Sequence, residues 1–200
     1  METLPGIIGV AGTNASLKGT LAARRQATQF TRTAELSDIL RIEVTNRGLS
    51  HERENLRTIS TEWGRKFGAG ALATMTLNRY QEERLETDTG ISIVSVRRPA
   101  EARAIQDAGG AIVWLDADAE LRYERVAGGN RGRIDDQKTL EEFIAEEAVE
   151  MNPSSDDPFL VNMSGVREIA DFHVDTSFAG VDAETGTVLS HGYLTREFGI

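Results

Sequence analysis

Residues 6–20 read GIIGVAGTNASLKGT, an apolar run that passes directly into a polar loop containing glycine. The apolar part, residues 6–11, is continuous rather than alternating, which is typical of a strand buried on both faces of a parallel sheet. Helix-favouring residues follow the loop over residues 21–25. The order strand, loop, helix therefore predicts that the loop lies at the carboxyl end of a buried strand and opens a helix.

The loop itself resembles the phosphate-binding pattern G-x-x-x-x-G-K-[ST]. Such a loop directs backbone N–H groups at oxyanions beside a helix N-terminus, and its lysine reaches the terminal phosphates. Gly12 takes the first glycine position, Lys18 takes the lysine position, and Gly19 and Thr20 follow in the K-G-T form of nucleotide kinases. We predict that nine residues bind the nucleotide: Gly12, Thr13, Asn14, Ala15, Ser16, Leu17, Lys18, Gly19 and Thr20.

Leu17 departs from this pattern, because it stands where the second glycine belongs. If the position needs a positive φ, leucine costs about 1–3 kcal/mol there, and its side chain could intrude on the phosphates. The alternative explanation of the stretch is an ordinary strand-to-helix turn with a surface lysine.

The rest of the chain alternates between apolar runs and helical patterns. The further apolar runs cover residues 33–36, 91–96, 111–115 and 172–174. The helical patterns cover residues 38–47, 52–63, 69–85, 99–107, 120–126 and 139–151. This alternation predicts an α/β layered fold with right-handed crossovers.

Composition excludes several classes of function. The 200 residues carry 22 Lys+Arg and 32 Asp+Glu, a formal net charge of −10, which argues against a nucleic-acid partner. The absence of cysteine excludes disulfides, thiolate catalysis and cysteine zinc sites, and the three histidines lack zinc-ligand spacing, so we predict no metal site. Without a membrane-length apolar run or a secretory signal, we expect one cytoplasmic domain, residues 1–200, with no membrane partner.

Beyond the loop, residues 5–176 resemble the P-loop nucleoside monophosphate kinases, the adenylate kinase and dephospho-CoA kinase group. The segment 37–41, Ser-Asp-Ile-Leu-Arg, is similar to the G-D-[ML]-L-R segment of adenylate kinases, whose arginine binds the acceptor phosphate. Residues 93–99 lie where the family places D-G-x-P-R or D-G-x-R at the end of its third strand. Residues 116–125 resemble the approach to the lid in dephospho-CoA kinases, and residues 131–136 resemble the arginine-bearing lid itself.

This resemblance implies a three-layer P-loop kinase fold with a five-stranded, mostly parallel sheet. It also implies an inserted helical acceptor-binding region at about residues 38–89 and a short lid at about residues 126–138. The implied activity is transfer of the γ-phosphoryl group of ATP, with Mg²⁺, to a small nucleotide-like substrate of the nucleoside monophosphate or dephospho-CoA type. The implied catalytic residues are Lys18, Arg131 and Arg133, and the implied acceptor-binding residues are Asp38, Arg41, Arg97 and Arg98.

Other interpretations stay open at this stage. Ser95 stands where the family carries an aspartate that supports Mg²⁺ through water, so a non-catalytic nucleotide- or anion-binding homologue with a degenerate loop is the main alternative. A regulatory or scaffold protein that keeps the fold only for partner contacts is another. The acidic residues of 141–150 are expected to form a solvated helical face, with contacts to lid arginines as the alternative. The sequence predicts neither the acceptor nor the oligomeric state.

Overall fold

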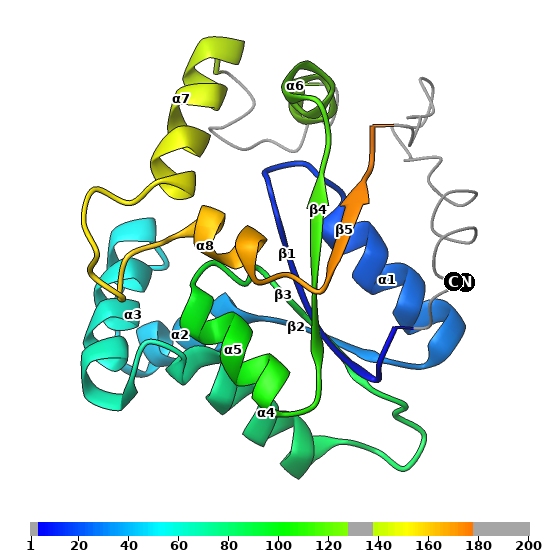
Figure 1. Cartoon of the computed structure of the whole chain (residues 1–200). Helices are drawn as coiled ribbons and strands as arrows, with labels where there is room; N and C mark the ends of the chain where they lie inside the picture. Colours follow the sequence, from blue (N-terminus) through cyan, green and yellow to red (C-terminus); the bar gives the residue numbers. More distant parts are fainter. Residues whose placement is uncertain (1–3, 128–137, 178–200) are drawn as a thin grey trace.

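The structure is a computed structural model that describes residues 4–127 and 138–177. Its sheet has five strands in the order β2-β3-β1-β4-β5, and each neighbouring pair is parallel (Figure 1). The strands are β1 (Ile7–Gly12), β2 (Arg32–Glu35), β3 (Ile91–Val94), β4 (Ala111–Asp116) and β5 (Phe172–Asp175). The expected five-stranded α/β sheet is confirmed, and among the described residues it is parallel throughout.

Helices connect the strands in the order that the sequence predicts. They are α1 (Lys18–Gln29), α2 (Leu36–Asn46), α3 (Arg53–Phe67), α4 (Ala71–Glu83), α5 (Pro99–Asp107), α6 (Ala119–Ala127), α7 (Leu140–Met151) and α8 (Met163–Glu168). Among the helices of the described residues, only α8 was not expected, because six residues are too few to show a helical period. No helix in residues 4–127 or 138–177 combines the length and apolar character needed to cross a bilayer.

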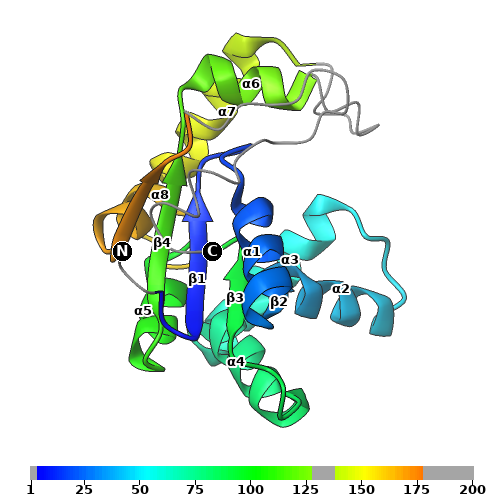
Figure 2. The same ribbon diagram turned by 90° about the vertical axis from the view of Figure 1, so that its right-hand side faces the viewer.

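The central strand explains why its apolar run is continuous. Ile8 and Val10 pack with Leu21 of α1 on one face of the sheet, whereas Ala11 packs into a larger cluster on the other face. Figure 2 shows α1 on one side of β1 and β4, and α5 and α8 on the other. Both faces of β1 are therefore buried, as the fold of a parallel three-layer protein requires.

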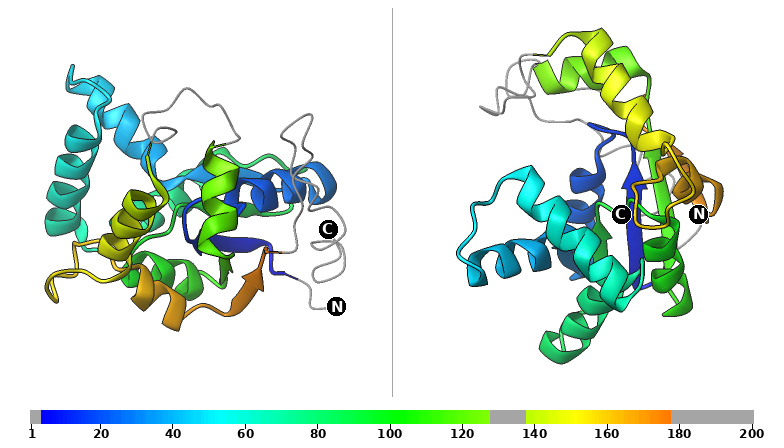
Figure 3. Two further views of the ribbon diagram at one scale, coloured as in Figure 1. Left: turned by 90° about the horizontal axis from the view of Figure 1, so that it is seen from above. Right: turned by 90° about the vertical axis from the view of Figure 1, so that its left-hand side faces the viewer.

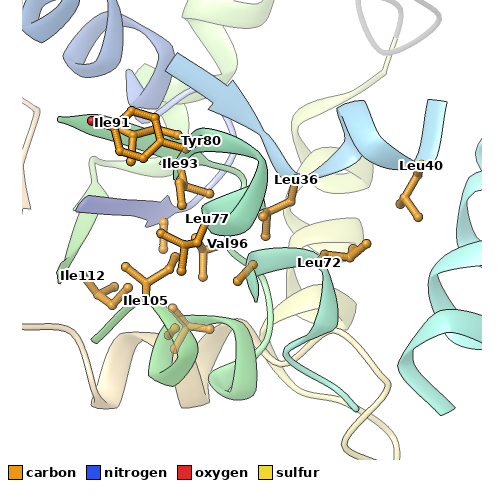
Figure 4. Close-up of a cluster of buried hydrophobic side chains, with 14 of the residues drawn as sticks. Leu36, Leu40, Leu72, Leu77, Tyr80, Ile91, Ile93, Val96, Ile105 and Ile112 are labelled. Atoms are coloured by element: carbon orange, nitrogen blue, oxygen red, sulfur yellow. The ribbon is translucent and has the colours of Figure 1, made fainter. Parts of the chain in front are cut away.

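The larger apolar cluster fixes the helical region between β2 and β3 against the sheet. Side chains of β3, α4 and α5 meet in it, as Figure 4 shows for Leu72, Leu77, Tyr80, Ile91, Ile93 and Ile105. Leu36, Leu40 and Val44 of α2 join the same cluster. The helices α2, α3 and α4 thus belong to the packed core and hold the end of β2 in a defined place.

Parallel strands bring their carboxyl ends to one edge of the sheet, and the candidate residues lie at this edge. Figure 3 shows α2 and α3 to one side of these strand ends. In its right-hand view, α6 and α7 lie above the strand ends. The loop between β1 and α1 lies between these two groups of helices, beside the ends of β3 and β4. Most of the expected lid, residues 128–137, lies outside the described residues, and so do Arg131 and Arg133.

Candidate phosphate-binding site

The loop after β1 has an unusual backbone. Gly12, Ala15 and Leu17 all have positive φ, at 133°, 58° and 69°. Left-handed residues interspersed among residues of negative φ can turn backbone N–H groups toward one side, which is how a loop forms an anion-binding concavity. The position of the second glycine therefore does require a left-handed conformation, and Leu17 adopts it at a cost of about 1–2 kcal/mol.

Contacts with β4 fix the base of this loop. A Cβ at Gly12 would lie 2.0 Å from the carbonyl oxygen of Leu115, so only glycine fits there. The Thr13 hydroxyl donates a hydrogen bond of 2.7 Å to Asp116 Oδ1. The Ser16 hydroxyl donates to the Thr13 carbonyl oxygen at 2.8 Å. The first glycine of the motif is thus required by the approach of the neighbouring strand.

Lys18 points back into the loop that precedes it. Its Nζ donates to the carbonyl oxygens of Gly12, at 2.9 Å, and of Thr13. Burial, together with the positive charges of Arg97 and Arg122, lowers the pKa of Lys18 from 10.5 to about 8. Glu147 and Glu150 act in the opposite direction. Because burial disfavours the charged ammonium, an anion bound in this loop would stabilise it.

The first turn of α1 leaves backbone donors available next to Lys18. The N-cap residue Leu17 makes no side-chain capping bond, and the first turn holds no acidic residue. The amides of Lys18, Gly19 and Thr20 have no carbonyl partner within their own helix, as at any helix start. Gly19 and the half-buried Thr20 thus lie in the first turn, where the sequence placed them. This helix start can bind a phosphate group.

Two residues that sequence reasoning missed lie against the loop. Arg122 of α6 donates to the Asn14 carbonyl oxygen at 3.2 Å, and its guanidinium forms a bidentate pair with Glu147 of α7. The Asn14 amide donates to Glu147 Oε2 at 3.2 Å. The expectation of a wholly solvated acidic face on α7 is therefore wrong for Glu147. No motif could reveal this contact, because it depends on how α6 and α7 pack over the loop.

The end of β2 carries the segment that resembles the adenylate kinase motif. Arg41 is half-exposed, and its guanidinium donates to the Ser37 hydroxyl at 2.8 Å and to Asp38 Oδ1 at 3.1 Å. Asp38 Oδ2 accepts from the Glu35 amide, which caps α2. Asp38 thus both starts the helix and holds Arg41 at the carboxyl edge of the sheet.

The two neighbouring arginines after β3 have opposite environments. The side chain of Arg97 is 45% exposed and pairs with Glu150 at 3.0 Å. Arg98 is only 8% exposed, and its guanidinium donates to Glu101, the Ser60 hydroxyl and the Phe159 carbonyl oxygen. Each of the three guanidinium nitrogens of Arg98 donates to a protein atom, so Arg97 is the more accessible member of the pair. Binding of an acceptor by Arg98 stays a prediction.

Ser95, the residue directly after β3, has a left-handed backbone, at φ 68°. A non-glycine residue in this conformation stores strain of about 1–2 kcal/mol, which is common beside functional sites. The turn leads directly to Arg97. Within residues 4–127 and 138–177, no cluster of three or more acidic or histidine side chains could hold a metal ion.

No family model and no curated protein matches the sequence. Solved structures do match. A crystal structure of TT1252 from Thermus thermophilus has 14% identity, a TM-score of 0.54, and coverage of 98% of this chain and 100% of that chain. Shikimate kinase from Acinetobacter baumannii, in complex with shikimate, has 16% identity, a TM-score of 0.50, and coverage of 98% and 93%.

This chain has the P-loop kinase fold. At such identities the likeness concerns the fold, and the chemistry must be argued from the residues themselves. The resemblance to the adenylate kinase and dephospho-CoA kinase group stays a prediction, because the solved structures that match belong to other kinases of this fold or carry no activity in their names.

Proposed function

We propose that the protein transfers the γ-phosphoryl group of ATP to a small nucleotide-like acceptor. The observation that carries this proposal is the position of Lys18, which lies inside a strained, glycine-anchored loop at the carboxyl end of β1. That loop shape supplies converging amide donors, and Lys18 supplies the charge for terminal phosphate oxygens. Residues 12–20 would bind the nucleotide.

Phosphoryl transfer demands little covalent chemistry from a protein. It requires that donor and acceptor are held in line and that charge on the transferring group is neutralised. Lys18 would supply part of this charge, and we propose that Arg131 and Arg133 supply the rest when the donor is bound. Because guanidinium groups bind phosphate oxygens in a bidentate manner, these arginines suit that role.

Mg²⁺ fits this site as part of its complex with ATP. Mg²⁺ is usually held by substrate phosphates, water and one or two carboxylates, so an all-protein cage is not required. Asp116 lies against the loop through Thr13, and Thr20 lies in the first turn of α1. When bound, Mg²⁺ would neutralise charge on the phosphate oxygens.

Arg41 and Arg97 are the acceptor-binding residues that we propose, with Asp38 positioning Arg41. Both guanidinium groups are about half exposed, and each pairs with a carboxylate in an exposed ion pair. Exposed ion pairs are worth only about 0–1 kcal/mol, so an anionic acceptor could displace them at little cost. An acceptor with a phosphate group suits two such arginines.

One alternative has support from a specific observation. Leu17, in the loop after β1, and Ser95, directly after β3, are both non-glycine residues with positive φ. Both lie in the region that would bind ATP and Mg²⁺. A loop that has lost its second glycine could still bind an anion without supporting transfer. The alternative function is therefore a non-catalytic nucleotide- or anion-binding protein.

An acceptor screen tests the two functions against each other. The folded protein is incubated with ATP and Mg²⁺ and with nucleoside monophosphates, deoxynucleotides, dephospho-CoA or non-nucleotide phosphates, and products are detected by mass spectrometry. We expect transfer to one class, reduced at least about a hundredfold in Lys18→Met, since one charged donor is lost from the transition state. ATP binding without transfer to any acceptor would favour the non-catalytic alternative.

A further inference from the structure

In this structure, the loop between β1 and α1 binds a carboxylate side chain of the same protein. Glu147 Oε2 accepts a hydrogen bond from the Asn14 amide, one of the loop donors. Its other oxygen, Oε1, accepts from Arg122 Nη2 at 2.7 Å. A carboxylate that accepts both a loop amide and a guanidinium has the same partners that a phosphate group would have at this place.

The charges around Glu147 form a compact cluster. Lys18, Arg97 and Arg122 supply positive charge, and each of the two arginines pairs with one carboxylate of α7. Glu147 and Glu150 are three residues apart, so they lie on one face of α7, toward the loop. The helix therefore neutralises the same cations that a polyphosphate would.

Burial explains why the cluster needs an anion. Arg122 is 4% exposed, and its only carboxylate partner closer than 3.5 Å among the described residues is Glu147. Asp116 lies farther from the guanidinium, with Oδ1 3.7 Å from Arg122 Nε. Without Glu147 the buried guanidinium would keep two carbonyl partners and the more distant Asp116. Loss of its closest carboxylate is costly, so displacement of Glu147 is favoured when another anion replaces it.

We propose that Glu147 occupies the place of a phosphate group, and that an entering polyphosphate displaces it and takes over Arg122. This inference rests on the proposed function, because it assumes that the loop binds phosphates. It adds Arg122 to the residues that contact the donor. It also implies that α7 covers the loop and must shift before the donor binds.

The test uses inorganic tripolyphosphate, which has the negative charges of the ATP triphosphate but lacks the nucleoside. Its affinity is measured by calorimetry for the wild type, for Glu147→Gln and for the control Glu146→Gln. Glu146 lies on the same helix but pairs with Lys138, and its side chain is 57% exposed. Removing the competing charge at Glu147 should tighten binding about tenfold, whereas the control should match the wild type.

Two further results complete the test. In the Glu147→Gln background, Arg122→Lys should lose most of the gain, since lysine cannot bind phosphate in a bidentate manner. In the wild type, saturating tripolyphosphate should speed hydrogen exchange of residues 140–151 and leave α5 unchanged. The exchange experiment does not depend on how well the variants fold.

Equal affinity of the wild type and Glu147→Gln for tripolyphosphate would overturn the proposal, as would no binding by either protein. Unchanged exchange of α7 in the complex would overturn it too. Failure of the kinase proposal has a different signature: tripolyphosphate binds more tightly to Glu147→Gln, but no acceptor receives a phosphoryl group.

Discussion

The loop between β1 and α1 holds its shape through its backbone, whereas the arginines at the ends of β2 and β3 are held by side-chain pairs. In the loop, the Leu115 carbonyl oxygen leaves no room for a side chain at Gly12, and Ala15 and Leu17 have left-handed conformations. At the ends of β2 and β3, Arg41 and Arg97 are exposed, and each pairs with a nearby carboxylate. The first region is preformed, and the second can rearrange around a ligand.

Under the proposed function, the two regions would have different roles, the first in binding the donor and the second in binding the acceptor. A preformed donor site costs little conformational entropy when phosphates bind. Exposed arginines can exchange weak ion pairs for an acceptor, which allows different acceptors to use similar positions. The predictions below test the rigid side and the adaptable side in turn, beginning with the largest expected effect.

Gly12→Ala should be the most harmful substitution in the loop. The new Cβ would lie 2.0 Å from the Leu115 carbonyl oxygen at a residue with φ of 133°, so the loop or β4 must shift. We expect a loss of at least about 3 kcal/mol in the free energy of unfolding. The matched control is Gly19→Ala, whose Cβ meets nothing within 4 Å. Equal denaturant midpoints of the two variants would show that the loop is not rigid.

Arg98→Met should destabilise the protein while Arg97→Met does not. Glu101 is 2% exposed, and burial raises its pKa although the Arg98 guanidinium and two backbone amides counteract this. Without Arg98, the Glu101 carboxylate loses its only cationic partner within residues 4–127 and 138–177. We expect a loss of about 3 kcal/mol for Arg98→Met and less than about 0.5 kcal/mol for Arg97→Met. Urea unfolding checks both, and the reverse order would mean that the two roles are exchanged.

Donor binding should weaken as the pH rises, because the free protein holds Lys18 with a pKa of about 8. Bound phosphates favour the charged ammonium, so binding above this pH takes up a proton. The affinity for ATP should fall about tenfold between about pH 7 and pH 9. Calorimetry in buffers of different ionisation enthalpy measures the uptake. In Lys18→Arg, where the side chain stays charged, this pH dependence should vanish; its persistence would place the titrating group elsewhere.

Leu17→Gly should give the smallest effect, an increase in stability and in affinity for ATP. Glycine removes the strain of a left-handed leucine at φ 69°, which should stabilise the protein by about 1 kcal/mol and tighten ATP binding. Leu17→Ala is the control, because it removes the bulk of the side chain but keeps the strained Cβ. Tighter ATP binding in both variants would assign the obstruction to the side chain, and a change in neither would mean that the loop tolerates leucine.

The sequence pattern predicted the features that depend on residues close together in the chain. The continuous apolar run of residues 6–11 located the central strand, and the missing second glycine located a left-handed backbone at Leu17. The five-stranded, mostly parallel sheet followed from the alternation of strands and helices together with the resemblance, whereas the order of its strands was not predicted. These features depend on neighbours in sequence, so a single sequence contains them.

Contacts between distant segments were not predictable in the same way. Arg98 is buried because Ser60, Glu101 and the Phe159 carbonyl oxygen converge on it from three segments. Glu147 meets the loop only because α7 packs over it, 133 residues from Asn14. From the sequence, Arg98 was expected to bind an acceptor and Glu147 to lie on a solvated helical face. Their environments depend on the packing of distant segments, which the sequence pattern does not reveal.

The most direct test of the central claim is a calorimetric titration of the folded protein with ATP and Mg²⁺, repeated on Lys18→Met. If the loop after β1 binds the donor phosphates, the wild type binds in the micromolar range and Lys18→Met loses most of this affinity. No detectable binding by the folded wild type, or equal binding by the two proteins, would contradict the claim that this loop is the donor site.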